Sequence, residues 1–161
     1  IWENQFNLFD SHDTSRLHNN AQVHREEYRG AVMFQFMLPG AASIYYGDEA
    51  GMVGAGDPYN RGTYPWGREE PILMAHFKAL GAIRKREEVL RLGDIAFFEA
   101  NDRHLGFTRT LNGRKVKIYV NRSGDPWEIP THRLYFGVNM KLVAKDHLII
   151  GGRGFCITED I

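Results

Sequence analysis

Six consecutive polar residues, 11–16 (SHDTSR), form the densest group of potentially reactive side chains in the sequence. They follow a short apolar segment. His12 and Asp13 could hold an imidazole and a carboxylate beside a sugar ring or a carbonyl group. A short polar loop that contains His and Asp also forms turns and helix caps in many proteins. The segment therefore has two interpretations, a reactive site and a structural turn.

Short apolar strands alternate with helical patterns before residue 92, an order typical of a parallel α/β structure. We expect a strand at residues 4–9, a helix over residues 25–38, a strand at residues 42–46 and a helix from Pro71. In a parallel α/β barrel, reactive side chains gather at the carboxyl ends of the strands. Each expected strand runs into a polar cluster, as that arrangement requires.

The helix that begins at Pro71 has one apolar stripe at helical spacing. Its members are Ile72, Leu73, His76, Phe77, Leu80 and Ile83. Because His76 lies on this stripe, we interpret it as a packed or capping histidine rather than a ligand. The preceding residues 51–66 are rich in Gly, Pro, Asp and Asn, which predicts a long surface loop.

From Asp94 onward the apolar period falls to two. The segments 105–111 and 115–120 flank Asn112-Gly113, a dipeptide typical of a tight hairpin turn. Further strands are expected at residues 95–99, 127–129, 141–143, 147–150 and 155–158, with turns that include Gly151-Gly152. Many short strands with turns at this spacing predict an antiparallel sandwich.

The composition disfavours nucleic acids and membranes as binding partners of this chain. Twenty Lys and Arg balance twenty Asp and Glu, so no overall charge attracts nucleic acid or an anionic membrane. No apolar run approaches the ~18 residues that span a bilayer. Cys156 is the single cysteine, which excludes an internal disulfide, and its apolar neighbours predict a buried thiol rather than a reactive one. The chain begins at Ile1 without an initiator Met, so we expect a piece of a longer protein.

Two segments, in this order and at this separation, resemble the α-amylase superfamily, glycoside hydrolase family 13. Residues 7–13 (NLFDSHD) resemble its last conserved segment, and residues 40–49 (GAASIYYGDE) are similar to its eighth barrel strand. Residues 57–61 (DPYNR) and 64–66 (YPW) further resemble the neopullulanase, cyclomaltodextrinase and maltogenic amylase subgroup, as does Ser11.

This resemblance implies an α+β fragment. Residues 1–91 would be the last two β/α units of a TIM (β/α)8 barrel, from strand seven to helix eight. Residues 92–161 would be the antiparallel β-sandwich C-domain that follows the barrel. The pattern changes near Leu92-Gly93-Asp94, which is where we place the domain boundary.

The resemblance also assigns roles to four residues. Asp13 matches the family's third acidic residue, which stabilises the transition state and is neither nucleophile nor proton donor. His12 matches the histidine that hydrogen-bonds the same glucose unit. Asp57 and Arg61 match a pair that contacts a sugar further along the non-reducing side. This pair could fork onto adjacent hydroxyls, or its members could pair with each other to hold the loop.

Other residues near the strand ends also have two interpretations. For Asp48 and Glu49 we favour a structural role. Tyr45 and Trp66 could stack on a sugar face, although aromatics beside a buried strand are more often part of a core.

The chemistry requires groups that this sequence lacks. Retaining glycoside hydrolysis needs two carboxyl groups about 5 to 5.5 Å apart, which this family places on the fourth and fifth barrel strands. The resemblance therefore implies a retaining hydrolase of α-1,4 and also α-1,6 glucan linkages as the parent, with an α-glucan as its partner. We expect this fragment alone to be inactive, and we expect no metal or cofactor in it.

Three other expectations remain open. The chain could instead be a non-catalytic carbohydrate-binding or interaction module. A metal site built from His12, Asp13, His18 and His24 ranks third, because the spacing matches no common ligand pattern. An open barrel fragment would expose residues 31–38 and 44–46, so we expect this part to self-associate, to pack on the sandwich or to be poorly ordered.

Overall fold

A computed structural model describes residues 5–19, 24–130, 133–144 and 146–160. The chain divides into two compact units, residues 1–83 and 84–161. The domain boundary that the change of pattern predicts after residue 91 lies within the second unit and stays a prediction. Of the expected first strand, Asn4 lies outside the described residues.

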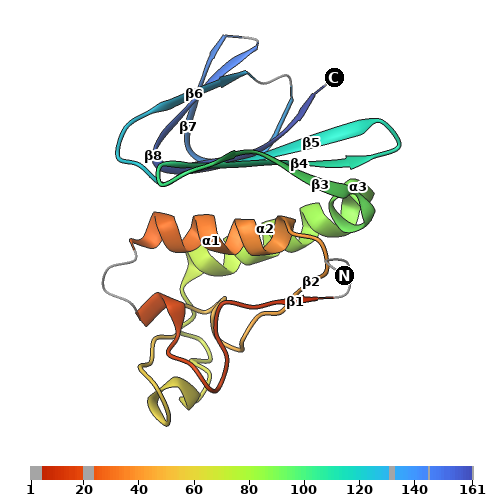
Figure 1. Cartoon of the computed structure of the whole chain (residues 1–161). Helices are drawn as coiled ribbons and strands as arrows, with labels where there is room; N and C mark the ends of the chain where they lie inside the picture. The colour runs from red at the N-terminus through yellow and green to blue at the C-terminus, as the bar shows by residue number, and fades with distance from the viewer. Residues whose placement is uncertain (1–4, 20–23, 131–132, 145, 161) are drawn as a thin grey trace. The chain divides into compact units, whose positions relative to one another are not determined.

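The first unit is a strand–helix–strand–helix arrangement (Figure 1). Its elements are β1 (Phe6–Asn7), a 3-10 turn (Leu17–Asn19), α1 (Arg25–Met37), β2 (Ala41–Ala42), a second 3-10 turn (Tyr59–Arg61) and α2 (Pro71–Arg86). Strands β1 and β2 pair in parallel, with Phe6 opposite Ala41, because the chain returns through α1 between them. Both strands are shorter than the apolar runs that predicted them.

Local chemistry explains where α1 begins and ends. At its start, the Glu27 carboxylate accepts a hydrogen bond of 3.0 Å from the backbone N–H of His24. Glu26 and Glu27 also place negative charge at the positive end of the helix dipole. The helix ends before Pro39, and Gly40 adopts a φ of 87°, which favours glycine.

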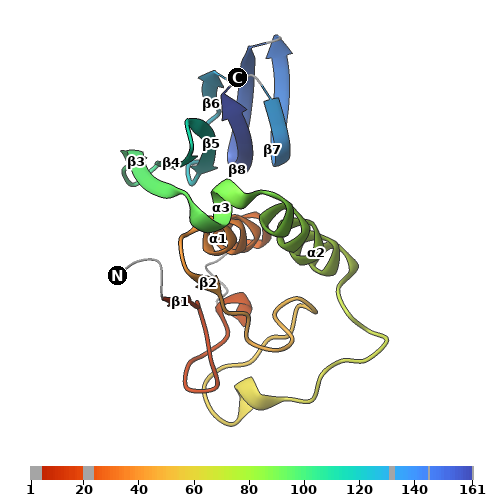
Figure 2. The same ribbon diagram turned by 90° about the vertical axis from the view of Figure 1, so that its right-hand side faces the viewer.

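Helices α1 and α2 lie side by side in two views (Figures 1 and 2). The rings of Phe36 in α1 and Phe77 in α2 pack edge to face, with their centres 6.0 Å apart. Most of residues 31–38, which we expect an open barrel fragment to expose, are buried in this structure. The Gln35 amide, for example, donates to the backbone oxygens of Asn7 and Ser43 at 2.7 Å each. The buried side chains in the segment are Val32, Met33, Gln35, Phe36 and Met37. The predicted stripe of α2 is confirmed except at Ile72, which is exposed.

His76 is a packed histidine, as its position on the stripe predicts. It is buried, and its Nε2–H donates a hydrogen bond of 2.9 Å to the backbone oxygen of Arg29 in α1. Burial lowers the pKa of His76 to about 4, because the charged imidazolium loses its hydration there.

This histidine makes stability depend on pH. The unfolded chain binds a proton at His76 below its ordinary pKa of 6.5, whereas the folded chain does so only near pH 4. Stability should therefore be complete above pH 6.5 and fall by at most about 3 kcal/mol as the pH drops toward 4. Denaturant unfolding at several pH values measures this loss of stability on acidification. The loss should be smaller in His76→Gln and unchanged in His147→Gln, because the ring of His147 is exposed. An equal loss in wild type and His76→Gln would contradict the assignment.

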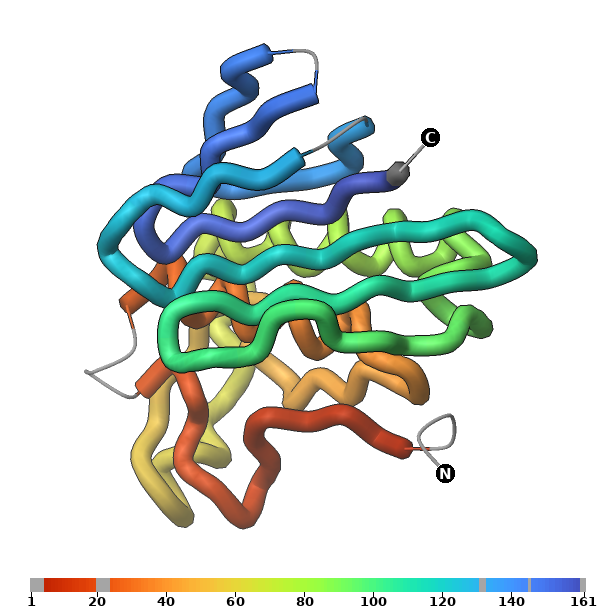
Figure 3. The backbone as a smooth tube through the Cα atoms, turned by 45° about the horizontal axis from the view of Figure 1, so that its top comes forward, coloured from red at the N-terminus to blue at the C-terminus, as the bar shows by residue number. Residues whose placement is uncertain are grey.

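The second unit is one short helix and a six-stranded antiparallel sheet (Figure 3). Its elements are α3 (Glu88–Leu92), β3 (Asp94–Ala100), β4 (His104–Leu111), β5 (Arg114–Asn121), β6 (Trp127–Pro130), β7 (Arg133–Ala144) and β8 (His147–Asp160). The strand order is β3-β4-β5-β8-β6, and β7 pairs with β8 along its other edge. The predicted hairpin between β4 and β5 is confirmed, with positive φ at Asn112 and Gly113.

Strand β8 curls the sheet. Its first part pairs with β6, with Ile150 opposite Trp127, and its last part pairs with β5, with Phe155 opposite Val120. The sequence predicts two strands here with a turn at Gly151-Gly152, and this prediction is wrong. The glycines lie inside one continuous strand, where the backbone bends without leaving the sheet.

One face of the sheet holds an apolar cluster. Its members are Tyr119, Ile129, Leu148, Ile150 and Cys156, with Trp127 and Met140 packed against them. Cys156 is fully buried, as predicted, and burial raises the pKa of its thiol well above the ordinary range. A thiol in this state is a poor nucleophile.

Arg109 joins α3 to the sheet. Its buried guanidinium donates hydrogen bonds to the backbone oxygens of Leu90 and Gly93, at 2.7 Å each. Burial lowers the pKa of Arg109 to about 10, yet the group stays charged at neutral pH. None of the helices in the described part of the chain has the length and apolar character needed to cross a membrane.

Candidate active-site segment

The segment after β1 is a turn that leaves the predicted catalytic carboxylate in solvent. The backbone N–H of Asp13 donates to the Ser11 hydroxyl at 3.1 Å, and the N–H of Ser11 donates to the Thr14 hydroxyl at 3.0 Å. Asp13 nevertheless exposes 74% of its side chain. The two interpretations of the segment are therefore compatible, since the turn presents the carboxylate.

His12 lies beside Asp13. Its Nε2 is 3.3 Å from Asp13 Oδ1, and 58% of the His12 side chain is exposed. A carboxylate and an imidazole at this separation, both open to solvent, can contact neighbouring hydroxyl groups of one sugar ring.

Asn60 holds this turn from a distant part of the chain, and sequence analysis assigned it no role. It lies in the second 3-10 turn and is fully buried. Its side-chain amide donates to the backbone oxygens of His12 at 2.9 Å and Thr14 at 2.7 Å, with a longer contact of 3.4 Å to Ser11. The only sequence signal was its place between Asp57 and Arg61.

Arg16 links the turn to two further segments. Its buried guanidinium pairs with Asp48 at 2.8 Å and donates from Nε to the backbone oxygen of Asn60 at 3.2 Å. The same group lies 4.3 Å from the ring centre of Tyr45 and 5.0 Å from that of Tyr46. These contacts agree with the structural role that we favoured for Asp48.

Asp10 and Asp48 form a buried acidic pair beside this arginine. Asp10 accepts a hydrogen bond of 2.8 Å from the backbone N–H of Leu17. Burial raises the pKa of Asp48, the hydrogen bond to Asp10 raises it further, and Arg16 opposes both effects. The hydroxyl of Tyr28 donates to the backbone oxygen of Asp48 at 3.3 Å, and burial raises the pKa of that phenol.

Asp57 and Arg61 pair with each other in this structure. The Arg61 Nε and Asp57 Oδ1 are 2.7 Å apart, and both side chains are largely exposed. Of the two alternatives that the sequence leaves open, this pairing is the one that holds the loop. Both side chains are exposed, so contact with a sugar is a proposal.

The two aromatic candidates differ in their surroundings. Tyr45 is half-buried against Arg16, and its hydroxyl donates to the backbone oxygen of Asn60 at 3.4 Å. Trp66 exposes 81% of its surface, so the expectation that it belongs to a core is wrong. The centres of the Trp66 and Tyr64 rings are 4.5 Å apart, and the pair presents an aromatic surface to solvent.

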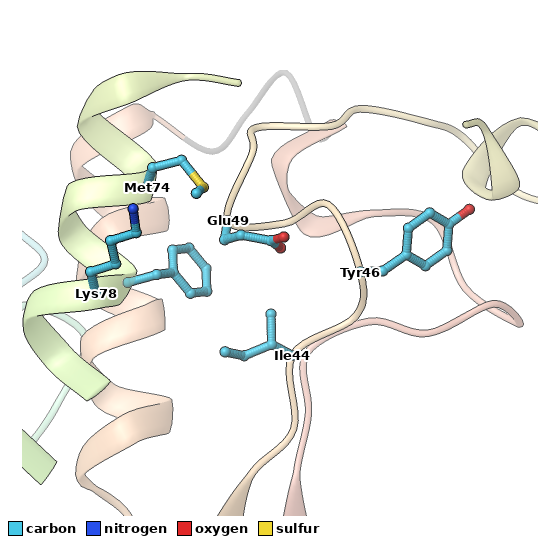
Figure 4. Close-up of a pocket in the computed structure, with 6 residues that line it drawn as sticks. Ile44, Tyr46, Glu49, Met74 and Lys78 are labelled. Carbon is cyan, nitrogen blue, oxygen red and sulfur yellow. The ribbon is translucent and has the colours of Figure 1, made fainter. Parts of the chain in front are cut away.

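A separate pocket lies between the chain after β2 and helix α2. Figure 4 shows Ile44 and Glu49 facing Met74 and Lys78 across it, and Tyr46 and Phe77 complete the lining. The pocket measures about 430 Å³. The predicted site residues do not line it. Ile44 and Tyr46 are partly exposed here, as expected for an open barrel edge.

In the described ranges, no group of three or more His, Cys, Asp and Glu side chains is arranged to hold a metal ion. His12, Asp13, His18 and His24 are not gathered into such a group.

The fold and the site together define a class of protein. Two parallel β/α units carry an exposed acidic residue after the first strand, and a curled antiparallel sheet follows them. This order of elements is that of the last part of a (β/α)8 barrel followed by an antiparallel β-sandwich. The family model described as "Alpha amylase, catalytic domain" matches residues 1–88, and the chain belongs to the α-amylase family of glycoside hydrolases.

Similar proteins carry related names. A cyclomaltodextrinase of Geobacillus thermopakistaniensis (strain MAS1) is 40% identical over 132 residues, which is 80% of this chain and 22% of that protein. Neopullulanase 2 of Thermoactinomyces vulgaris is 35% identical over 74% of this chain and 21% of its own length. The crystal structure of a debranching enzyme from Nostoc punctiforme superposes with a TM-score of 0.85 at 26% identity, covering 98% of this chain and 36% of that one.

These comparisons confirm the predicted fold class. The chain corresponds to about a fifth of the length of the cyclomaltodextrinase and to about a third of the debranching enzyme structure. The matched enzymes are therefore much longer than the segment described here.

Proposed function

We propose that this chain is the carboxyl-terminal part of a retaining glycoside hydrolase that cleaves α-1,4 linkages of starch-type glucans, with α-1,6 linkages as a second target. The observation that carries the proposal is the exposed Asp13 carboxylate beside His12, on a turn after a parallel strand. The names of the similar proteins, cyclomaltodextrinase, neopullulanase and debranching enzyme, support an α-glucan substrate.

Each of the four predicted site residues would have its own role toward the substrate. The transition state of glycoside hydrolysis has oxocarbenium character, so the negative charge of Asp13 would stabilise it and bind the sugar hydroxyls. His12 would hydrogen-bond the same glucose unit. Asp57 and Arg61 would contact a second sugar by exchanging part of their mutual ion pair for hydroxyl groups.

The nucleophile and the general acid would come from the preceding part of the barrel. Their absence from these 161 residues means that Asp13 has no reaction to assist in the isolated chain. The partly exposed apolar residues Ile44 and Tyr46 would then contact that preceding part, or a second copy of the chain.

An assay of the intact protein beside the isolated 161-residue chain tests this proposal. With maltooligosaccharides, cyclodextrin and pullulan as substrates, the intact protein should release sugars whose anomeric configuration is retained, as followed by NMR. The isolated chain should release none. Inversion, or no hydrolysis by the intact protein, would refute the proposal. Glucan binding without hydrolysis would instead favour a carbohydrate-binding module, for which the exposed Trp66 would be the natural contact.

A further inference from the structure

We infer that Asn60 is a positioning residue that holds the Asp13 turn in its working geometry. The inference rests on the proposed function, because it gives Asn60 a role only through the carboxylate of Asp13. The hydrogen bonds of Asn60 go to the backbone before and after Asp13 and not to the Asp13 side chain. Asn60 would therefore act on the carboxylate indirectly, through the backbone.

The first argument is the geometry of the amide. Asn60 Nδ2 donates to the carbonyl oxygens of His12 and Thr14, the residues directly before and after Asp13. Both distances, 2.9 and 2.7 Å, are those of good hydrogen bonds. The two bonds fix the His12–Asp13 and Thr14–Ser15 peptide planes, one before Asp13 and one beyond it, so they restrict the direction in which its carboxylate leaves the turn.

The second argument is that Asn60 is itself held in place. It is fully buried, and its backbone oxygen accepts from Arg16 Nε. Arg16 is in turn fixed by Asp48 and by the backbone of Gly54, whose oxygen accepts from the Arg16 N–H at 3.0 Å. The turn is therefore held by Asp48, in the segment after β2, and by the loop 51–66, in addition to its own hydrogen bonds.

The third argument is the cost of this arrangement. Asn60 Oδ1 is buried and accepts no hydrogen bond within the described residues. A buried acceptor without a partner is unfavourable by about 1–3 kcal/mol. The side chain keeps this orientation because a rotated amide would turn its oxygen toward the carbonyl oxygens of the turn. The donor function of Asn60 thus decides its conformation.

The sharpest variant is Asn60→Asp in the intact protein, because it keeps the shape and replaces the donor by an acceptor. We expect kcat on maltooligosaccharides to fall about a hundredfold or more, with KM changed less than about threefold. Hydrogen exchange of the amides in residues 10–16 should become at least about tenfold faster. Asn60→Ala removes the donor without adding a charge, and it should show the same changes in kcat, KM and amide exchange. If Asn60→Asp does not fold, Asn60→Ala tests the inference in its place.

Asn121 supplies a matched control in the second unit. It is also buried, and its amide donates to the backbone oxygens of Asp125, Ile150 and Gly151 at 2.7, 3.2 and 3.0 Å. Asn121→Ala should lower the stability of the fold as Asn60→Ala does, yet leave kcat of the folded enzyme unchanged. If both variants lower kcat equally, Asn60 is merely structural and the inference is overturned.

A double variant shows whether Asn60 acts through Asp13. In the Asp13→Asn background, adding Asn60→Ala should lower kcat no further, because the group that it positions is already gone. A full additional loss would overturn the inference. If the intact wild type hydrolyses no α-glucan, the proposed function fails, and unchanged amide exchange in Asn60→Ala would overturn the holding role as well.

Discussion

Replacing Asp13 by Asn in the intact protein should lower kcat at least about a thousandfold, which corresponds to about 4 kcal/mol of transition-state stabilisation. Asn keeps the shape of the side chain but carries no charge, so it cannot stabilise an oxocarbenium-like centre electrostatically. The turn should persist, because Asp13 contributes to it through its backbone N–H and not through its carboxylate. Steady-state kinetics and a thermal unfolding scan measure the two effects.

Asp125 provides the comparison for this variant. Its side chain is 73% exposed and pairs with Arg103, much as Asp13 is 74% exposed and lies beside His12. Asp125→Asn should leave kcat unchanged. Near-normal turnover in Asp13→Asn, or an equal loss in both variants, would remove Asp13 from the catalytic role.

Replacing Arg16 by Met should lower the free energy of unfolding by about 3–5 kcal/mol. The guanidinium is buried and holds together Asp48, Asn60 and the ring of Tyr45. Its removal leaves the Asp48 carboxyl buried without its cation, while the long apolar stem of Met refills most of the volume. Denaturant unfolding gives the loss directly.

The partner of Arg16 makes the origin of this loss testable. In Asp48→Asn the buried carboxyl is replaced by a neutral amide, so the double variant Arg16→Met with Asp48→Asn should lose less stability than the sum of the two single variants. Arg103→Met removes an exposed pair and should lose less than about 1 kcal/mol. If Arg16→Met destabilises no more than Arg103→Met, the network around Arg16 does not hold this unit together.

The order and type of the elements could be predicted from the sequence because local rules govern them. Pro39-Gly40 ends α1, Pro71 starts α2, and Asn112-Gly113 forms the hairpin turn. Each of these depends on backbone conformations of one to four neighbouring residues. The polar segment around Asp13 is apparent for the same reason, since its residues are adjacent in the chain, whereas the roles of its residues rest on the resemblance to the α-amylase family.

Strand lengths and the path of β8 did not follow from such rules. The glycines at 151 and 152 predict a turn, but Ile150 before them and Phe155 after them both pair with β7, so the chain continues in one strand. The segment 31–38 is apolar and is expected to be exposed in an open barrel, yet most of its side chains are buried, with the ring of Phe36 against that of Phe77 in α2. In both cases a tertiary neighbour overrides a local tendency.

Residue types and their order along the chain predicted a polar segment directly after the first strand, and the resemblance to the α-amylase family supplied the roles proposed for its residues. The contacts that hold this segment in place come from residues far away in the sequence. Asn60 lies 46 residues from Thr14 and Arg16 lies 32 residues from Asp48, and no periodicity of a helix or strand reports on contacts of that range. Hydrogen bonds between such distant groups depend on the folded chain bringing them together, and they are stronger where burial lowers the local dielectric constant.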